Sequence, residues 1–222
     1  MREFIQEKYK NIKDSIYSTD YSSIYPDFIN FGLGDPDIRT HEMIIKEAYD
    51  SQVKGFTHYE DPQGYLGLRK EIAKAYKEDF GVKCQPEEIL ITMSGTEAMY
   101  IILETILNPG DEVIVPSPYF SVYPDQIEMT KGLPVIYETK FENDFKLEPR
   151  EIEKLITTKA KALIINTPNN PTGAVYSDDT LKEIYELAKN IIFLSFVTTS
   201  TQFIPTKANL SQWLPTMKNL KM

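Results

Sequence analysis

Hydrophobic and polar positions along this chain follow two alternating patterns. Short apolar runs, bounded by turn-forming residues, predict strands at 28–31, 89–92, 113–115, 135–137 and 162–165. Between them, apolar residues recur three and four positions apart. They predict helices at 40–54, 66–79, 94–107, 124–130, 149–156 and 177–189. This order predicts an α/β fold: a mostly parallel sheet with helices on both faces.

The ends of several helices carry capping residues. We expect Thr40 to cap the helix at 40–54, Gly81 to close the helix at 66–79 and Ser177 to open the last one. Residues 1–27 form a separate part, an N-terminal helical arm with an apolar face. That face consists of Phe4, Ile5, Tyr9, Ile12 and Ile16.

Composition narrows the class of protein. A chain of 222 residues, 41% of them hydrophobic, can bury a sizeable core. The net charge is −9 without a dense Lys/Arg cluster, which argues against a nucleic-acid partner. The single cysteine, Cys84, excludes a disulfide framework and a cysteine metal site and fits a reducing compartment. Because we find neither a signal-type segment nor an 18-residue apolar run, we expect a soluble cytoplasmic protein without a membrane partner.

Charge is distributed unevenly along the chain. Residues 190–222 contain three lysines and no Asp, Glu, Arg or Gly, so residues 1–189 carry 24 − 3 = 21 basic against 33 acidic residues. We therefore treat 190–222 as an atypical tail.

Three unusual stretches follow predicted strands: SGTEA (94–98), PSPYF (116–120) and NTPNNPTG (166–173). In open α/β sheets, ligands bind at the carboxyl ends of strands. Convergence of three such stretches predicts a ligand site at that edge.

Each stretch has a functional and a purely structural interpretation. SGTEA precedes a helix, whose free N–H groups and dipole favour an anion such as phosphate; it is also an ordinary Ser/Thr cap. Phe120 offers a face to a flat heteroaromatic ring, or packs as a core aromatic. The Asn-rich loop 166–173 suits a phenolate oxygen on a ring, with its Pro bonds fixing the Asn side chains if they are cis, or is only a turn-rich loop.

Together these motifs resemble class I/II aminotransferases of the pyridoxal-phosphate (PLP) fold-type-I superfamily. The resemblance covers residues 28–189 in order and spacing. It rests on Gly34–Asp37, Tyr59, Gly64, Leu68–Arg69, Ser94–Ala98, Pro118–Phe120, Tyr123 and Asn166–Gly173. It implies that 28–189 is an incomplete PLP-binding large domain.

The resemblance also implies residue roles. Backbone N–H groups of Ser94, Gly95 and Thr96 hold the PLP phosphate, and Phe120 stacks on the pyridine ring. Asn170 donates to the phenolic oxygen of the ring, and Asn166 shapes the loop with Pro168. Gly34 lies beside the substrate carboxylate. Tyr59 reaches the phosphate of a neighbouring subunit, which implies a homodimer. The substrates implied are an amino acid and a 2-oxo acid, and no metal is implied.

Three groups expected in the family have no counterpart after position 189. They are the carboxylate on the pyridine nitrogen, the Schiff-base lysine and the arginine for the substrate carboxylate. Lys207, in IPTKANL, lacks the Ser-rich context expected of the lysine. We therefore expect no catalytic residue here, and an N-terminal portion of an aminotransferase that is inactive by itself.

A shifted reading frame explains the tail. When the third base of each codon is read with the next two, Lys189 to Thr201 permit KYNIFVICDDVY, as expected of the family at this point. The opposite shift yields no Asp or Glu. A genuinely truncated domain and an alternative transcript remain open. The functional alternatives are a carbon–sulfur lyase of the same superfamily and a non-catalytic fragment that binds a full-length partner.

Overall fold

The computed structural model describes residues 27, 38–187 and 192–196, in two compact units divided after Tyr59. The first unit contributes α2 (Glu42–Val53). The helices of the second unit are α3 (Leu66–Phe80), η4 (Pro86–Glu88), α4 (Gly95–Ile106), α5 (Val122–Met129), η5 (Phe141–Asn143), α6 (Pro149–Glu153) and α7 (Asp178–Leu187). The arm up to residue 26, the strand expected at 28–31 and the tail from 197 lie outside the described residues.

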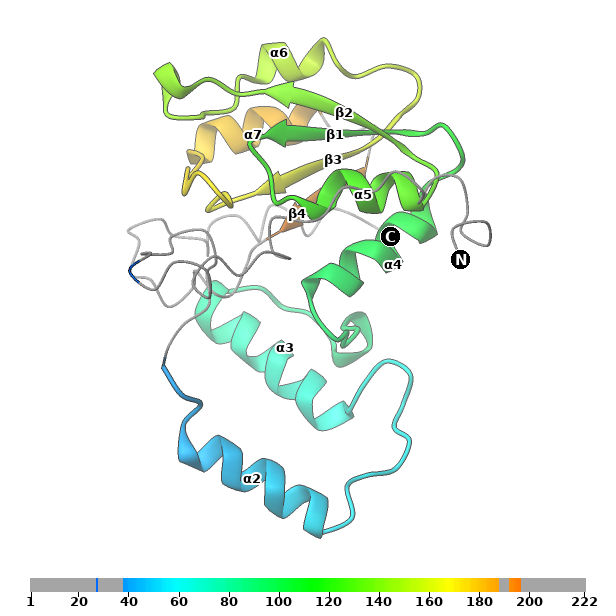
Figure 1. Ribbon diagram of the computed structural model, residues 1–222, viewed down its shortest axis with the longest axis vertical. Coiled ribbons are helices and arrows are strands. Elements are labelled where there is room, and N and C mark those ends of the chain that lie inside the picture. Colours follow the sequence, from blue (N-terminus) through cyan, green and yellow to red (C-terminus); the bar gives the residue numbers. More distant parts are fainter. Residues whose placement is uncertain (1–26, 28–37, 188–191, 197–222) are drawn as a thin grey trace. The chain divides into compact units, whose positions relative to one another are not determined.

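The second unit is built on a parallel sheet in the order β2–β1–β3–β4 (Figure 1). The strands are β1 (Glu112–Ser117), β2 (Leu133–Glu138), β3 (Ala160–Asn166) and β4 (Ile192–Phe196). β4 falls within the segment 190–222. An apolar strand is compatible with both reading frames there.

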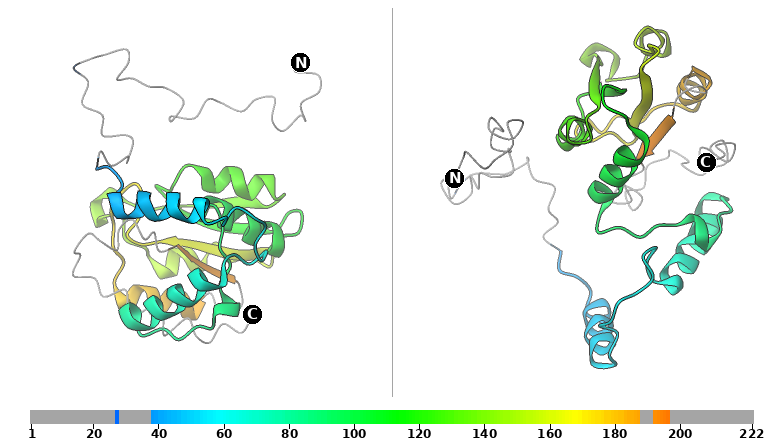
Figure 2. Two further views of the ribbon diagram at one scale, coloured as in Figure 1. Left: turned by 90° about the horizontal axis from the view of Figure 1, so that it is seen from below. Right: turned by 90° about the vertical axis from the view of Figure 1, so that its right-hand side faces the viewer.

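Helices cover both faces of the sheet, as the sequence predicts. Val113, Val115 and Ile164 pack with α4 and α5 in one buried cluster. Their neighbours Ile114 and Leu163 point to the other face, into a cluster with α6 and α7. The right-hand view of Figure 2 shows α5 in green and α7 in gold on opposite sides of the strands. Strands buried on both faces are apolar throughout, and this explains the continuous apolar runs.

The strand order creates a switch point between β1 and β3. The chain leaves β1 for β2 on one side and reaches β3 on the other, so the loops after β1 and β3 diverge. Pairing between β1 and β3 ends at Ile114–Leu163, whereas the outer pairs continue to Ser117–Glu138 and Asn166–Phe196. The two central strands therefore part before their carboxyl ends, where such folds bind ligands.

Two local predictions were wrong. Residues 89–92 form no strand, because no described strand pairs with this segment. The N–H of Ile91 instead donates to the carbonyl of Gln63, in the loop before α3, at 2.9 Å. The N-cap of α2 is His41 rather than Thr40: its imidazole Nδ1 accepts from the N–H of Met43 at 3.2 Å. The prediction for Gly81 is confirmed, since it ends α3 at φ 66°.

Among the described residues, no helix is both long and apolar enough to cross a membrane. The same part of the chain contains no group of three or more His, Cys, Asp or Glu side chains arranged to hold a metal ion.

Candidate functional site

The loop after β3 is organised by the side chains of its own asparagines. Asn166, the last residue of β3, is 4% exposed, and its Oδ1 accepts from the N–H of Asn170 at 2.8 Å. Asn169 is 8% exposed; its Oδ1 accepts from the N–H of Thr172 (3.1 Å) and from its hydroxyl (2.8 Å). The Thr167–Pro168 and Asn170–Pro171 bonds are cis. The hydrogen bonds of the Asn166 and Asn169 side chains explain most of the unusual composition as loop structure.

Asn170 is the exception in this loop. Its backbone is fixed through Asn166, but its side chain is exposed and makes no hydrogen bond among the described residues. A carboxamide on a backbone held in this way, with no acceptor for its donors among the described residues, is suited to an acceptor on a bound ring. The structural and functional interpretations of the loop therefore apply to different asparagines.

The loop after β1 places two aromatic rings next to each other. The rings of Phe120 and Tyr123 meet edge to face, with centroids 5.7 Å apart. Phe120 is half-buried and packs against the cluster beneath α4 and α5. Tyr123 belongs to that cluster, and burial raises the pKa of its phenol to about 12. The phenol is therefore neutral at neutral pH.

The first turn of α4 combines a cap with unused donors. The hydroxyl of Ser94 accepts from the N–H of Glu97 (3.4 Å), and the Glu97 carboxylate accepts from the N–H of Met93. The cap interpretation is therefore right for the Ser94 side chain. The N–H groups of Ser94, Gly95 and Thr96 nevertheless have no acceptor in the part of the chain that the structure describes. A Cβ added at Gly95 would meet nothing within 4 Å. Free N–H groups at the positive end of a helix form an anion site.

A hydrogen bond connects this turn to α5, the helix that follows the loop after β1. The side chain of Gln126, on α5, donates from Nε2 to the carbonyl oxygen of Thr96 at 2.8 Å. We did not predict Gln126 from the sequence. The sequence nevertheless contained an indication. Gln126 lies three residues after Tyr123 on the buried face of α5, where an apolar residue is usual.

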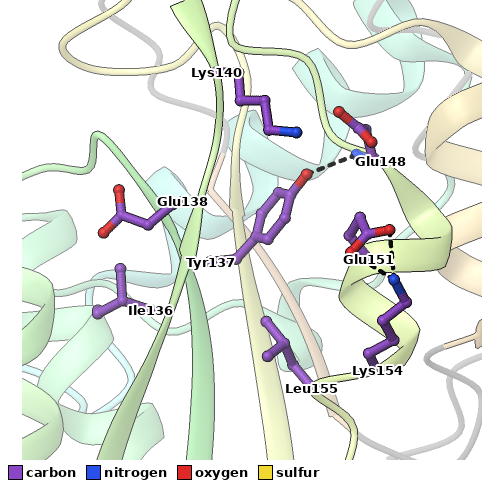
Figure 3. A pocket seen from close by; sticks show the side chains of 8 residues that line it. All are labelled: Ile136, Tyr137, Glu138, Lys140, Glu148, Glu151, Lys154 and Leu155. Carbon is purple, nitrogen blue, oxygen red and sulfur yellow. Dashed lines mark hydrogen bonds and ion pairs between the residues drawn. The ribbon is translucent and has the colours of Figure 1, made fainter.

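Two predicted site residues lie elsewhere. Tyr59 is fully exposed in the first unit, and Gly34 lies outside the described residues. Two hollows lined by described residues contain none of the predicted site residues. Figure 3 shows one of them, about 250 Å³ in volume, between β2 and α6. In it, the hydroxyl of Tyr137 accepts from the N–H of Glu148 at 3.2 Å, and Lys154 pairs with Glu151.

Comparison with known protein families shows which family the chain belongs to. The family model described as aminotransferase class I and II matches residues 26–197. The chain belongs to this family. The match ends eight residues after position 189 and includes β4, and it covers both loops at the switch point as well as the first turn of α4.

Individual aminotransferases resemble the chain over about three quarters of its length. It is 37% identical over 171 residues to an aspartate aminotransferase of Bacillus sp. strain YM-2, which covers 76% of this chain and 44% of that protein. It is 41% identical over 161 residues to aromatic-amino-acid aminotransferase 2 of Thermococcus litoralis, covering 72% and 41%. The chain therefore spans less than half the length of these relatives.

Solved structures agree in fold. The aspartate aminotransferase of Thermus thermophilus with maleate superposes with a TM-score of 0.71 at 37% identity, covering 73% of this chain and 43% of that one. The aromatic aminotransferase of Pyrococcus horikoshii gives 0.74 at 36% identity, covering 77% and 46%. These relatives are aminotransferases, so the carbon–sulfur lyase alternative is not favoured.

Proposed function

We propose that this chain is the cofactor-holding N-terminal portion of a PLP-dependent aminotransferase. The complete protein would transfer an amino group between an amino acid and a 2-oxo acid, as a homodimer in which Tyr59 reaches the neighbouring subunit's phosphate. When bound, PLP supplies an electron-withdrawing ring for the bond changes at the amino-acid α-carbon.

The observation that carries the proposal is the set of free donors at the first turn of α4. The N–H groups of Gly95 and Thr96 are unpaired among the described residues, and the space above Gly95 is open. A phosphate group fits this turn because its oxygens accept hydrogen bonds and its charge is favoured by the helix dipole. The residues present therefore fit PLP.

The remaining residues act on the ring of the cofactor. Phe120 limits one face of the ring, and its edge contact with Tyr123 restrains its own orientation. Asn170 donates from its amide to the ring oxygen, with its backbone held by Asn166. Gly34, which is outside the described residues, would lie beside the substrate carboxylate in the complete protein. Each residue binds or orients, and none of them moves a proton.

We propose that the 222-residue chain does not catalyse transamination, since residues 190–222 supply neither Arg nor a carboxylate, and Lys207 lacks the expected context. Incubation with PLP followed by borohydride reduction and peptide mapping tests this. We expect partial labelling spread over exposed lysines and no amino transfer from a ¹⁵N-labelled amino acid to a 2-oxo acid. Stoichiometric labelling of one lysine, together with amino transfer, would contradict the proposal.

A further inference from the structure

Gln126 occupies a position where a polar side chain is unfavourable. It is 6% exposed and lies on the buried face of α5, together with Tyr123, Ile127 and Thr130. Its Nε2 bonds the carbonyl of Thr96, while its Oε1 is buried without a hydrogen-bond partner among the described residues. The amide must have this orientation, because a carbonyl oxygen can only accept.

A purely structural role does not explain this residue. An unpaired buried oxygen disfavours folding, and an apolar side chain of similar size would avoid it. Within the described part of the chain, the side chain of Gln126 makes one hydrogen bond, and it goes to another helix, at the turn whose N–H groups have no acceptor there. Local features that lower stability are typical of functional sites.

The bond acts on a specific peptide plane. The Thr96 carbonyl and the Glu97 N–H belong to one rigid unit. Gln126 holds the carbonyl end of this unit at 2.8 Å, and the Ser94 hydroxyl holds its N–H end at 3.4 Å. Fixing this plane fixes the first turn of α4, which carries the free N–H groups of Gly95 and Thr96.

We propose that Gln126 is a positioning residue for the phosphate group: it links α5 to the first turn of α4 and preorganises the anion-binding N–H groups. This inference rests on the proposed function and adds to it a residue that does not touch the cofactor. It predicts that phosphate affinity depends on Gln126 more strongly than folding does.

The test is hydrogen–deuterium exchange of the full 222-residue chain, followed by mass spectrometry at residues 94–97 as inorganic phosphate is added. Gln126→Met removes the donor and the unpaired oxygen, and Gln126→Asn keeps the amide but is one methylene too short to reach Thr96. Thr130→Val is the matched control: Thr130 is buried on the same face, but its hydroxyl bonds carbonyl oxygens of its own helix, at 3.0 Å to Gln126 and 2.9 Å to Ile127.

We expect the phosphate concentration for half-protection to rise about three- to tenfold in both Gln126 variants, which corresponds to one lost neutral hydrogen bond. Thr130→Val should lower the thermal midpoint without changing that concentration. Two independent Gln126 variants keep the test valid if one fails to fold. The inference is overturned if phosphate protects the wild-type chain and the half-protection concentration is the same in the Gln126 variants. It is also overturned if Thr130→Val changes that concentration as much as they do. Either result leaves the proposed function intact. Absence of phosphate protection in the wild-type chain overturns both.

Discussion

The side-chain oxygen of Asn166 accepts a hydrogen bond from the backbone N–H of Asn170 across 2.8 Å. This bond joins the buried end of β3 to the residue whose exposed carboxamide we assign to the cofactor ring. The two asparagines therefore have different roles: Asn166 stabilises the shape of the loop, and the side chain of Asn170 is available to bind a ligand.

This division predicts opposite effects of two alanine substitutions. Asn166→Ala should lower the free energy of unfolding by about 1–2 kcal/mol, because it leaves the Asn170 N–H without its acceptor. Asn170→Ala should change it by less than about 0.5 kcal/mol, because this side chain is exposed and has no hydrogen bond to any residue that the structure describes. Urea denaturation of both variants measures the difference. Equal destabilisation by the two variants would mean that the loop is structural throughout.

The buried arginine of α3, Arg69, predicts a second effect on stability, because it holds the loop 61–64. Arg69 is 4% exposed and donates to the carbonyls of Gly64 (2.9 Å) and Pro86 (3.2 Å) and to the side chain of Gln63 (3.1 Å). Arg69→Met should cost about 2–4 kcal/mol of unfolding free energy, since several acceptors lose a charged donor at once. The adjacent and exposed Lys70 supplies the control: Lys70→Met should leave stability unchanged. A small effect at Arg69, in the same urea titration, would show that the loop 61–64 is held by other contacts.

Two buried tyrosines predict how stability depends on pH. Burial raises the pKa of Tyr123 and of Tyr176 to about 12, above the ordinary value near 10. Because both folded pKa values are raised, the stabilisation is fully present below pH 10 and is lost as pH rises from 10 to 12. The slope should be about 1.4 kcal/mol per pH unit for each tyrosine. Denaturation at a series of pH values measures it, and Tyr123→Phe should reduce it by the contribution of one tyrosine. A pH-independent unfolding free energy across this window would show that the phenols ionise freely in the folded chain.

Apolar runs predicted the central strands well because β1 and β3 are buried on both faces. The runs at 113–115, 135–137 and 162–165 lie within β1, β2 and β3, and the structure extends each by one or two residues at either end. The same reasoning was wrong for 89–92, because a strand needs a partner and an apolar run of four residues does not indicate whether one exists.

For the site, the sequence indicated the loops after β1 and β3 and the first turn of α4, but not which of their atoms would be free. Ser94 is used as a cap, while the neighbouring N–H groups are not; this depends on backbone geometry that residue types do not determine. Gln126 was missed because its bond to Thr96 spans 30 positions. Such pairings come from helix packing rather than from local pattern.

The tail carries a prediction about the gene. If residues from about 190 onward are read in a shifted frame, the coding DNA should encode an aspartate in place of Val197 and, further on, a lysine and an arginine. Sequencing the DNA from codon 185 onward checks this. Codon third bases that forbid aspartate at that position would leave a truncated domain or an alternative transcript as the explanation.

The most direct test of cofactor binding at α4 compares pyridoxine 5′-phosphate with pyridoxine, neither of which has an aldehyde to react with lysines. Isothermal titration calorimetry should show tighter binding of the phosphorylated ligand by the wild-type chain. Gly95→Pro removes one free N–H at the first helical position, where Pro is well tolerated and the space is open. It should weaken the phosphorylated ligand by about three- to tenfold and leave pyridoxine unaffected. Asp178→Pro, at the first position of α7, is the control and should change neither affinity. Equal binding of the two ligands by the wild-type chain, or no effect of Gly95→Pro, would contradict a phosphate site at the first turn of α4.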